Sequence, residues 1–286
     1  MTSILPTGRT ISETQFEAIF ASRDPKGHKG TFGSAAILGG SSGMAGAVIL
    51  AGRAALKTGA GKVLLGMTQQ SNPIAYDSQY PELMIHEANS LLLRANEFNA
   101  WGAGCGLGQS AFAIQCLRQL LLKRQGKPLV LDADGLNAIS SGDASPTWGR
   151  GEVILTPHPT EAGRLLGVST DAVQASRETS ALAIAKKYRA WVVLKGAETI
   201  VCAPDLSWQI NPTGNVGLAT AGSGDVLTGI LVSLLAQGFK PEVAVTAGVW
   251  LHGAAADRLV DQGLGPIGLT AGELADAVRA IRNCTK

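Results

Sequence analysis

The strongest candidate for chemistry is a glycine-rich segment, Asn211–Gly229, whose central loop contains Gly222-Ser223-Gly224. The loop runs straight into an apolar stretch, 225–237, which predicts a helix. Glycines let the backbone approach a ligand closely, and the free N–H groups and dipole of a helix start attract anions. The segment therefore predicts a phosphate-binding loop.

Asp225 places a carboxylate at this electropositive helix start, and two roles fit it. It is either the N-cap of the helix, a position that Asp fills well, or a base. As a base it would meet a substrate hydroxyl beside a phosphate being transferred, where positioning and electrostatics supply most of the catalysis. The residue types alone leave both roles open.

Two further segments of small residues follow predicted strands. Residues 39–47 lead into a predicted helix and include Ala47, while residues 102–108 carry a glycine at every second position, Gly106 among them. The first segment resembles a dinucleotide fingerprint but does not match G-x-G-x-x-G. Both segments either pack a helix closely on the sheet or line the crevice in which open α/β sheets bind ligands.

Two more strands are followed by polar residues, at 132–137 and 156–161. A carboxylate at this edge would hold Mg²⁺ through water, because Mg²⁺ keeps much of its hydration. Asp134 and Thr160 fit the capping of helices as an alternative. His158 lies between two prolines, which present it rigidly.

Lys195 ends one predicted strand, and the next strand starts at Thr199. A lysine in such a hairpin is either a solvated charge or a phosphate contact. Taken alone, the position favours the solvated charge.

Short apolar runs alternate with longer helical stretches, and several runs are continuously apolar, as in buried parallel strands. The predicted strands are Ser34–Leu38, Lys62–Met67, Leu83–Ile85, Ala100–Ala103, Pro128–Asp132, Glu152–Thr156, Trp191–Lys195 and Thr199–Cys202. The predicted helices are Ala45–Thr58, Ala111–Arg124, Gly135–Ser140, Pro159–Leu166, Asp171–Arg189, Asp225–Gln237, Pro241–Asp261 and Thr270–Arg282. This order predicts one three-layer α/β domain over 1–286. The first helix, almost entirely apolar, is either a core helix or part of a subunit interface.

The composition is that of a globular chain. Its 286 residues are 45% hydrophobic and 16% charged, with a net charge of +2. This excludes a disordered or collagen-like chain and gives no stripe for nucleic acid. Without a signal sequence or a bilayer-spanning apolar stretch, we expect a cytoplasmic protein with no membrane partner. The cysteines form no C-x-x-C pair and the histidines no metal spacing, so we expect buried thiols and no zinc site.

Together these segments resemble the NAD(P)H-hydrate dehydratase family, the carbohydrate-kinase-related domain of the ribokinase-like superfamily. The resemblance runs from about Lys26 to Gly272. It rests on the ordered motifs K-G-H-K-G-T-F-G with G-G-S-S-G-M-A-G-A, D-A-D-G-L-N, T-P-H-P-T-E, K-G-A-E-T and T-A-G-S-G-D-V-L-T-G. It implies a ribokinase-like α/β/α fold with a mostly parallel central sheet. Many bacterial members carry a fused epimerase domain, but only about 25 residues precede the first motif here, so we expect none.

The resemblance also implies an activity. Members repair hydrated nicotinamide cofactor: the S-epimer of NADHX or NADPHX is dehydrated to NADH or NADPH by a lyase that uses ADP in bacteria. AMP and phosphate are released, and ATP is a possible replacement for ADP. The family further implies Mg²⁺, a homotetramer and a separate epimerase in the same pathway.

Site residues follow from the resemblance by position. Implied contacts to the hydrate are Ala47, Gly106, His158 and Asp225. Implied contacts to the nucleotide are Lys195, Gly196, Ala197, Glu198, Thr199, Gly222, Ser223 and Gly224. Asp225 would take the proton of the hydrate's C6 hydroxyl while its oxygen attacks the terminal phosphoryl group. Ribokinase-like sugar kinases carry Asn-x-x-Glu near the metal; here His158-Pro-Thr-Glu161 would leave Glu161 the water-mediated Mg²⁺ role.

Two other functions share these features. A ribokinase-like kinase of a small alcohol, such as a thiamin- or pyridoxal-type precursor, would use the same fold and the same Asp225. A nucleotide-sensing binding module would keep the loop without turnover. The products formed from a hydrate and a nucleotide distinguish the three.

Overall fold

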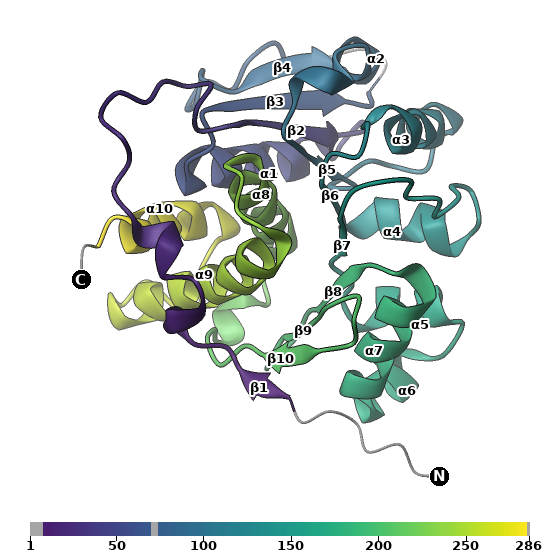
Figure 1. Ribbon diagram of the computed structural model, residues 1–286, viewed down its shortest axis with the longest axis vertical. Coiled ribbons are helices and arrows are strands. Elements are labelled where there is room, and N and C mark those ends of the chain that lie inside the picture. The colour runs from purple at the N-terminus through teal and green to yellow at the C-terminus, as the bar shows by residue number, and fades with distance from the viewer. Residues whose placement is uncertain (1–7, 70–73, 285–286) are drawn as a thin grey trace.

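The computed structural model describes residues 8–69 and 74–284, and its strands form one twisted sheet (Figure 1). Among these residues the sheet has ten strands in the order β1-β10-β9-β8-β7-β6-β5-β2-β3-β4. The strands are β1 Arg9–Thr10, β2 Ser34–Gly39, β3 Lys62–Met67, β4 Met84–Glu87, β5 Ala100–Ala103, β6 Leu129–Leu131, β7 Val153–Leu155, β8 Trp191–Leu194, β9 Ile200–Cys202 and β10 Trp208–Ile210. The α-helices are α1 Ala45–Thr58, α2 Ala88–Leu92, α3 Ala111–Lys123, α4 Ala133–Ser140, α5 Pro159–Leu166, α6 Thr170–Ala175, α7 Arg177–Tyr188, α8 Ser223–Ala236, α9 Pro241–Asp261 and α10 Ala271–Arg282.

The sheet is mostly parallel, as predicted. From β8 through β7, β6, β5, β2 and β3 to β4, every neighbouring pair runs parallel. The antiparallel pairs are β8 with β9 and β9 with β10. Lys195 therefore begins a hairpin loop, as the sequence indicated.

Helices cover both faces of the sheet, which confirms the α/β/α fold. In Figure 1, α1, α8, α9 and α10 lie on one side, and α2 to α7 lie on the other. Successive residues of a strand enter different cores: Ala35 and Ile37 of β2 pack with the first group, and Ala36 and Leu38 with the second. This alternation explains why the strands are continuously apolar. No helix in the described part of the chain is long and apolar enough to span a bilayer.

The helix α1 is a core helix. It packs on β2 and β3 and against α8 and α10, and Val48, Ala51 and Ala55 on its inner face are fully buried. Small side chains allow the close approach: a Cβ added to Gly229 of α8 would lie 2.0 Å from the carbonyl oxygen of Ala51. The apolar residues of this helix thus pack against other elements of the same chain.

Several elements differ from the predictions. The helix predicted over 171–189 is split into α6 and α7 because Ser176 has φ −148° and ψ 60°, outside the helical range. The strands β1 and β10 and the short helix α2 were not predicted. Cys105, Cys116 and Cys202 are buried free thiols, but Cys284 is exposed because it follows the end of α10.

The far end of the helical layer contains a cluster of cations. The C-terminal carbonyls of α1 accept hydrogen bonds from guanidinium groups: Thr58 from Arg282, and Gly59 from Arg23. Arg282 also donates to Ile19 at 3.2 Å and to the Gln237 side chain at 3.1 Å. A cavity of about 1070 Å³ lies beside these groups. Positive charge suits a helix C-terminus, whose carbonyls are otherwise unpaired.

Replacing Arg282 with Ala should lower the free energy of unfolding by about 3 kcal/mol, because buried carbonyls of α1 and Ile19 lose charged donors. Chemical denaturation measures the change. The matched control is Arg279→Ala, which removes an exposed pair with Asp276 and should cost less than about 0.5 kcal/mol. Equal losses in the two variants would contradict a stabilising role for this contact. The kinetic constants should not change in either variant, because the cluster lies at the opposite end of α1 from the candidate site.

Candidate active site at the carboxyl edge of the sheet

The glycine-rich loop leads into α8 as predicted. Gly222 is the residue before the helix, with a left-handed φ of +89°, and a Cβ there would lie 2.5 Å from Leu50. Ser223 starts the helix and donates its hydroxyl to the carbonyl of Leu218 at 2.8 Å. The first-turn N–H groups of α8 are therefore presented at the edge where the parallel strands end, which is the geometry of an anion site.

Asp225 is the third residue of α8, so of the two roles that its residue type left open, the N-cap is wrong. Gly222 holds the N-cap position, and no side chain makes the capping hydrogen bond. Burial raises the pKa of Asp225 to about 6; the thiol of Cys105 lowers it by hydrogen bonding, Asp132 raises it and Lys195 lowers it. A carboxyl group with this pKa is half ionised near pH 6 and is a better proton acceptor than an ordinary aspartate.

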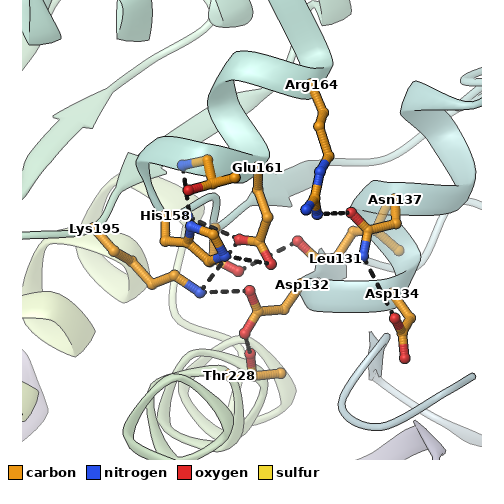
Figure 2. A network of polar contacts seen from close by, with 11 residues as sticks. Leu131, Asp132, Asp134, Asn137, His158, Glu161, Arg164, Lys195 and Thr228 are labelled. Carbon is orange, nitrogen blue, oxygen red and sulfur yellow. Dashed lines mark hydrogen bonds and ion pairs between the residues drawn. The ribbon is translucent and has the colours of Figure 1, made fainter. Parts of the chain in front are cut away.

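Lys195 is the centre of an ion-pair network, which Figure 2 shows. Its Nζ lies 2.7 Å from Oδ1 of Asp132 and 3.8 Å from Oε2 of Glu161. Burial lowers the pKa of Lys195, but the two carboxylates outweigh it and leave the pKa above its usual value. The interpretation of Lys195 as a solvated hairpin charge is therefore wrong.

Asp132 anchors this network. Its carboxylate is 2% exposed, and its second oxygen accepts a hydrogen bond of 3.1 Å from the hydroxyl of Thr228 in α8. A Cβ added to Gly224 would lie 3.2 Å from Lys195 Nζ and 3.5 Å from this carboxylate. The ends of β6 and β8 and the start of α8 are thus joined at one point, with Lys195 beside the predicted phosphate loop.

His158 caps α5 through its own side chain. Its Nδ1 accepts a hydrogen bond of 3.1 Å from the backbone N–H of Thr160, and Glu161 accepts one of 2.8 Å from the backbone N–H of His158. Thr160 is therefore not the cap, because His158 fills that position. Burial and then Lys195 lower the pKa of His158, so the ring is neutral near pH 7. With Nδ1 accepting, Nε2 carries the proton, and it lies 3.4 Å from Oε1 of Glu161.

Glu161 is buried, and burial raises its pKa. Within 8–69 and 74–284, no three acidic, histidine or cysteine side chains gather as a metal site. One Glu161 oxygen is already held by the capping bond, so direct coordination would compete with the helix start. Asp132 and Glu161 still present carboxylate oxygens near Lys195, a donor set that fits a hydrated Mg²⁺ bound through water.

Ala47 and Gly106 lie side by side on the other flank of the site. Gly106 has φ +57°, and a Cβ there would lie 3.1 Å from that of Ala47 and 2.6 Å from the carbonyl oxygen of Met44. The backbone of Ser41 donates to Gly106 at 2.7 Å and fixes the two loops together. The neighbour Cys105, whose thiol contacts Asp225, links this flank to the start of α8.

Asp134 does not cap α4. Its carboxylate accepts a hydrogen bond of 2.8 Å from the backbone N–H of Gly108, and the N-cap position belongs to Asp132. The contact ties the glycine run after β5 to the helix after β6. Asp134 therefore shapes the loop that carries Gly106.

The predicted nucleotide segment 196–199 forms the hairpin loop between β8 and β9. Gly196, Ala197 and Glu198 are exposed, and the Thr199 hydroxyl donates to the carbonyl of Gly196 at 2.9 Å. Gly196 has φ +139°, a conformation that favours glycine. The loop is open to a ligand on the same edge as Lys195.

The comparisons with known proteins identify the family. A family model described as NAD(P)H-hydrate dehydratase matches residues 35–279, most of the chain. This chain belongs to the NAD(P)H-hydrate dehydratase family. A relative from Neisseria meningitidis, named ADP-dependent (S)-NAD(P)H-hydrate dehydratase, is 48% identical over 94% of this chain and 91% of its own length. A protein of the same name from Bacillus subtilis is 35% identical over 88% of this chain and 90% of its own length.

Other relatives of this dehydratase family are larger. The chain covers 50% of a bifunctional NAD(P)H-hydrate repair enzyme from Escherichia coli, with 38% identity. Among solved structures, the ADP/ATP-dependent NAD(P)H-hydrate dehydratase from Bacillus subtilis, co-crystallised with ATP and Mg²⁺, has a TM-score of 0.82 at 33% identity and covers 96% of this chain and 97% of its own. A hydroxyethylthiazole kinase from Pyrococcus horikoshii has a TM-score of 0.65 at 15% identity over 94% of each chain, which shows the fold alone.

Three side chains of this dehydratase site were not predicted as site residues. Asp132 was noticed only as part of a motif, although a buried carboxylate directly after an apolar strand was a usable signal. Arg177 donates to the carbonyls of Leu194 and Lys195 at 3.2 and 3.3 Å and supports the hairpin loop. His252, buried in α9, has its pKa lowered to about 4 by burial and hydrogen-bonds to the backbone of Ser223. Nothing in the local sequence marks the last two.

Proposed function

We propose that this chain catalyses the ADP-dependent dehydration of the S-epimers of NADHX and NADPHX to NADH and NADPH, releasing AMP and phosphate. One observation carries the proposal: Asp225, with a pKa raised to about 6, lies in the first turn of α8, beside the N–H groups that we expect to bind phosphate. A carboxylate there is next to both a terminal phosphate and the group that attacks it. The names of the similar dehydratases support the choice of substrate.

The reaction begins at the hydroxyl group of the hydrate. Its oxygen forms a bond to the terminal phosphorus of ADP, the bond from that phosphorus to the bridging oxygen breaks, and AMP leaves. Asp225 accepts the hydroxyl proton as the new O–P bond forms, which suits a base of moderate pKa. The N–H groups at the start of α8 and the cation of Lys195 hold the negative oxygens of the transferred group.

The phosphorylated intermediate then loses phosphate. The lone pair of the ring nitrogen forms a C=N bond as the C–O bond to phosphate breaks. Loss of a proton from the adjacent ring carbon restores the dihydropyridine. The neutral imidazole of His158, whose Nε2 faces Oε1 of Glu161 at 3.4 Å, lies at the edge where we place the hydrate, so it contacts the ring without adding a charge.

Metal and assembly are further parts of the proposal. Mg²⁺ bound with the nucleotide would neutralise phosphate charge, and Asp132 and Glu161 are the carboxylates that would hold its water ligands. We also propose a cytoplasmic homotetramer that works with a separate epimerase. Sedimentation equilibrium of the purified chain tests the tetramer, and a monomer would contradict it.

The rate should fall as pH falls through about 6. Asp225 accepts a proton only when ionised, and burial raises its pKa to about 6, so activity is lost below that pH and is level above it. The measurement is kcat/KM for the hydrate between about pH 5 and 8 at saturating ADP, with the unfolding temperature recorded at each pH. An acid limb with a midpoint near about 4, the value of an exposed carboxyl, would contradict a buried base.

The direct test of the reaction supplies the purified protein with a hydrate and ADP. We expect the near-ultraviolet absorbance of the dihydronicotinamide ring to return, with AMP released. A stable phosphorylated alcohol would identify a small-alcohol kinase instead, and binding without turnover would identify a nucleotide-sensing module. Repeating the assay with ATP ranks the two nucleotides, and we expect the higher kcat/KM with ADP.

A further inference from the structure

A line of polar contacts crosses the edge of the sheet beside His158 (Figure 2). The backbone N–H of Gly108 donates a hydrogen bond to one carboxylate oxygen of Asp134. The second oxygen of Asp134 accepts a hydrogen bond of 3.4 Å from the side-chain amide of Asn137. The side-chain amide oxygen of Asn137 in turn accepts a hydrogen bond of 2.8 Å from Nη1 of Arg164. The line thus joins the loop that carries Gly106 to the helix that begins after His158.

Arg164 ends this line with a guanidinium group that forms no direct ion pair with a described residue, although its charge reaches Glu161 and lowers the pKa of that carboxyl. Among the residues that the structure describes, no acidic side chain lies within ion-pair distance of its guanidinium group, whose one side-chain contact is the neutral amide of Asn137. The residue is exposed in α5. One nitrogen is held in place, so the remaining N–H groups of a planar fork stay available to a ligand.

The charge acts on the site itself. Figure 2 shows the side chain of Arg164 extending from α5 toward Asn137, on the side of the network away from Lys195. Its positive charge is among those that lower the pKa of His158, after burial and Lys195. Two cations therefore flank His158: Lys195 on the side of the phosphate loop, and Arg164 on the side of Gly108.

We propose that Arg164 binds a phosphate group of the hydrate dinucleotide, a contact that rests on the proposed function. In the proposed function, the phosphates of ADP bind at the start of α8 and Lys195, whereas the hydrate contacts His158 and the loop of Gly106. A dinucleotide bound there carries its own diphosphate, and an arginine already oriented by Asn137 binds phosphate oxygens in a bidentate manner. Asn137 is the positioning residue for this contact.

The test compares Michaelis constants in Arg164→Gln. We expect KM for NADHX and NADPHX to rise about tenfold while kcat at saturation and KM for ADP stay unchanged, because the contact binds substrate and transition state equally. An equal rise of KM for both substrates would show that Arg164 binds the diphosphate. A rise of KM for NADPHX alone would show that Arg164 binds the ribose phosphate of that substrate. Asn137→Ala, which releases the guanidinium but keeps its charge, should give a smaller rise of the same kind.

The matched control is Arg118→Gln. Arg118 is also an exposed helical arginine with one neutral partner, the carbonyl of Asp143, and lies on α3. It should leave every constant unchanged. If Arg164 merely held α5 against α4, its loss would lower the unfolding temperature and kcat with no selective change in KM, and that result overturns the proposal.

Two further results separate this inference from the proposed function. A wild-type protein that restores no dihydronicotinamide refutes the function, and the Arg164 contact is then tested by titrating NADPH and following its fluorescence. An active wild type with unchanged constants in Arg164→Gln refutes the contact alone. Should Arg164→Gln fail to fold, Arg164→Lys keeps the charge but loses the fork, and we expect it to raise the same Michaelis constants by a smaller factor.

Discussion

Replacing Asp225 with Asn should lower kcat for hydrate dehydration by about 10²- to 10⁴-fold, the usual contribution of a general base. The amide has the same shape as the carboxylate but cannot accept the hydroxyl proton. The dissociation constant of ADP should change little, because the first-turn N–H groups of α8 and the cation of Lys195 remain. Single-turnover rates and nucleotide titration measure the two quantities separately.

The variant should also be well folded. Because the structure raises the pKa of Asp225 to about 6, it disfavours the ionised form, and a neutral side chain should unfold at a temperature no lower than wild type at pH 7. Asp171→Asn is the matched control, since Asp171 is another first-turn carboxylate, on α6, and is exposed. A fully active Asp225→Asn would show that the carboxylate is not the base.

Replacing Lys195 with Met should damage both stability and activity. The buried carboxylate of Asp132 loses its cation and keeps only Thr228, which should lower the free energy of unfolding by about 3 kcal/mol. The transferred phosphate also loses a charged donor, which should lower kcat/KM for ADP by about 100-fold. Denaturation and initial-rate kinetics on the same preparation measure the two effects.

A second substitution separates these two roles of Lys195. In Lys195→Met with Asp132→Asn, the buried charge is gone and Asn can still accept the hydroxyl of Thr228, so most of the lost stability should return. Activity should not return, because no cation faces the phosphate loop. Recovery of both properties would mean that Lys195 serves only to neutralise Asp132.

Most of the fold could be predicted because buried strands and the helices that cover them leave distinct apolar patterns in the sequence. The bounds of α1, α5 and α9 agree with the predictions, since apolar periodicity ends there at glycine, or begins at proline. The strand β10, of three residues, is too short to show a pattern. The break at Ser176 was missed because the residues on both sides of it continue a helical pattern, although serine favours helix caps over helix interiors.

The site was predicted in its segments but not in its contacts. Twenty of the 36 glycines lie in 26–66, 102–108 and 214–229, and this concentration indicated the edge of the sheet at which the loops meet. Local patterns do not show which charges pair across the sheet. Taken alone, the position of Lys195 therefore favoured a solvated charge, and only the family resemblance implied a nucleotide contact. The strand order β6-β7-β8 brings Lys195 within 2.7 Å of Asp132, 63 residues earlier.

Capping was misjudged for a related reason. Asp225, Asp134 and Thr160 are residue types that favour helix starts, but each lies after the true cap position in the structure. At α5 that position is taken by His158, an uncommon cap whose ring nitrogen accepts the hydrogen bond. Propensity alone does not reveal that a polar side chain near a helix start is turned toward a neighbouring loop instead.

The most direct measurement of the central claim is product stoichiometry with purified (S)-NADHX and ADP. The account predicts that each dihydronicotinamide restored, measured by its absorbance, is accompanied by one AMP and one phosphate, and that Asp225→Asn slows all three together. Accumulation of a phosphorylated hydrate with no return of absorbance would contradict it, as would restoration of absorbance without consumption of nucleotide.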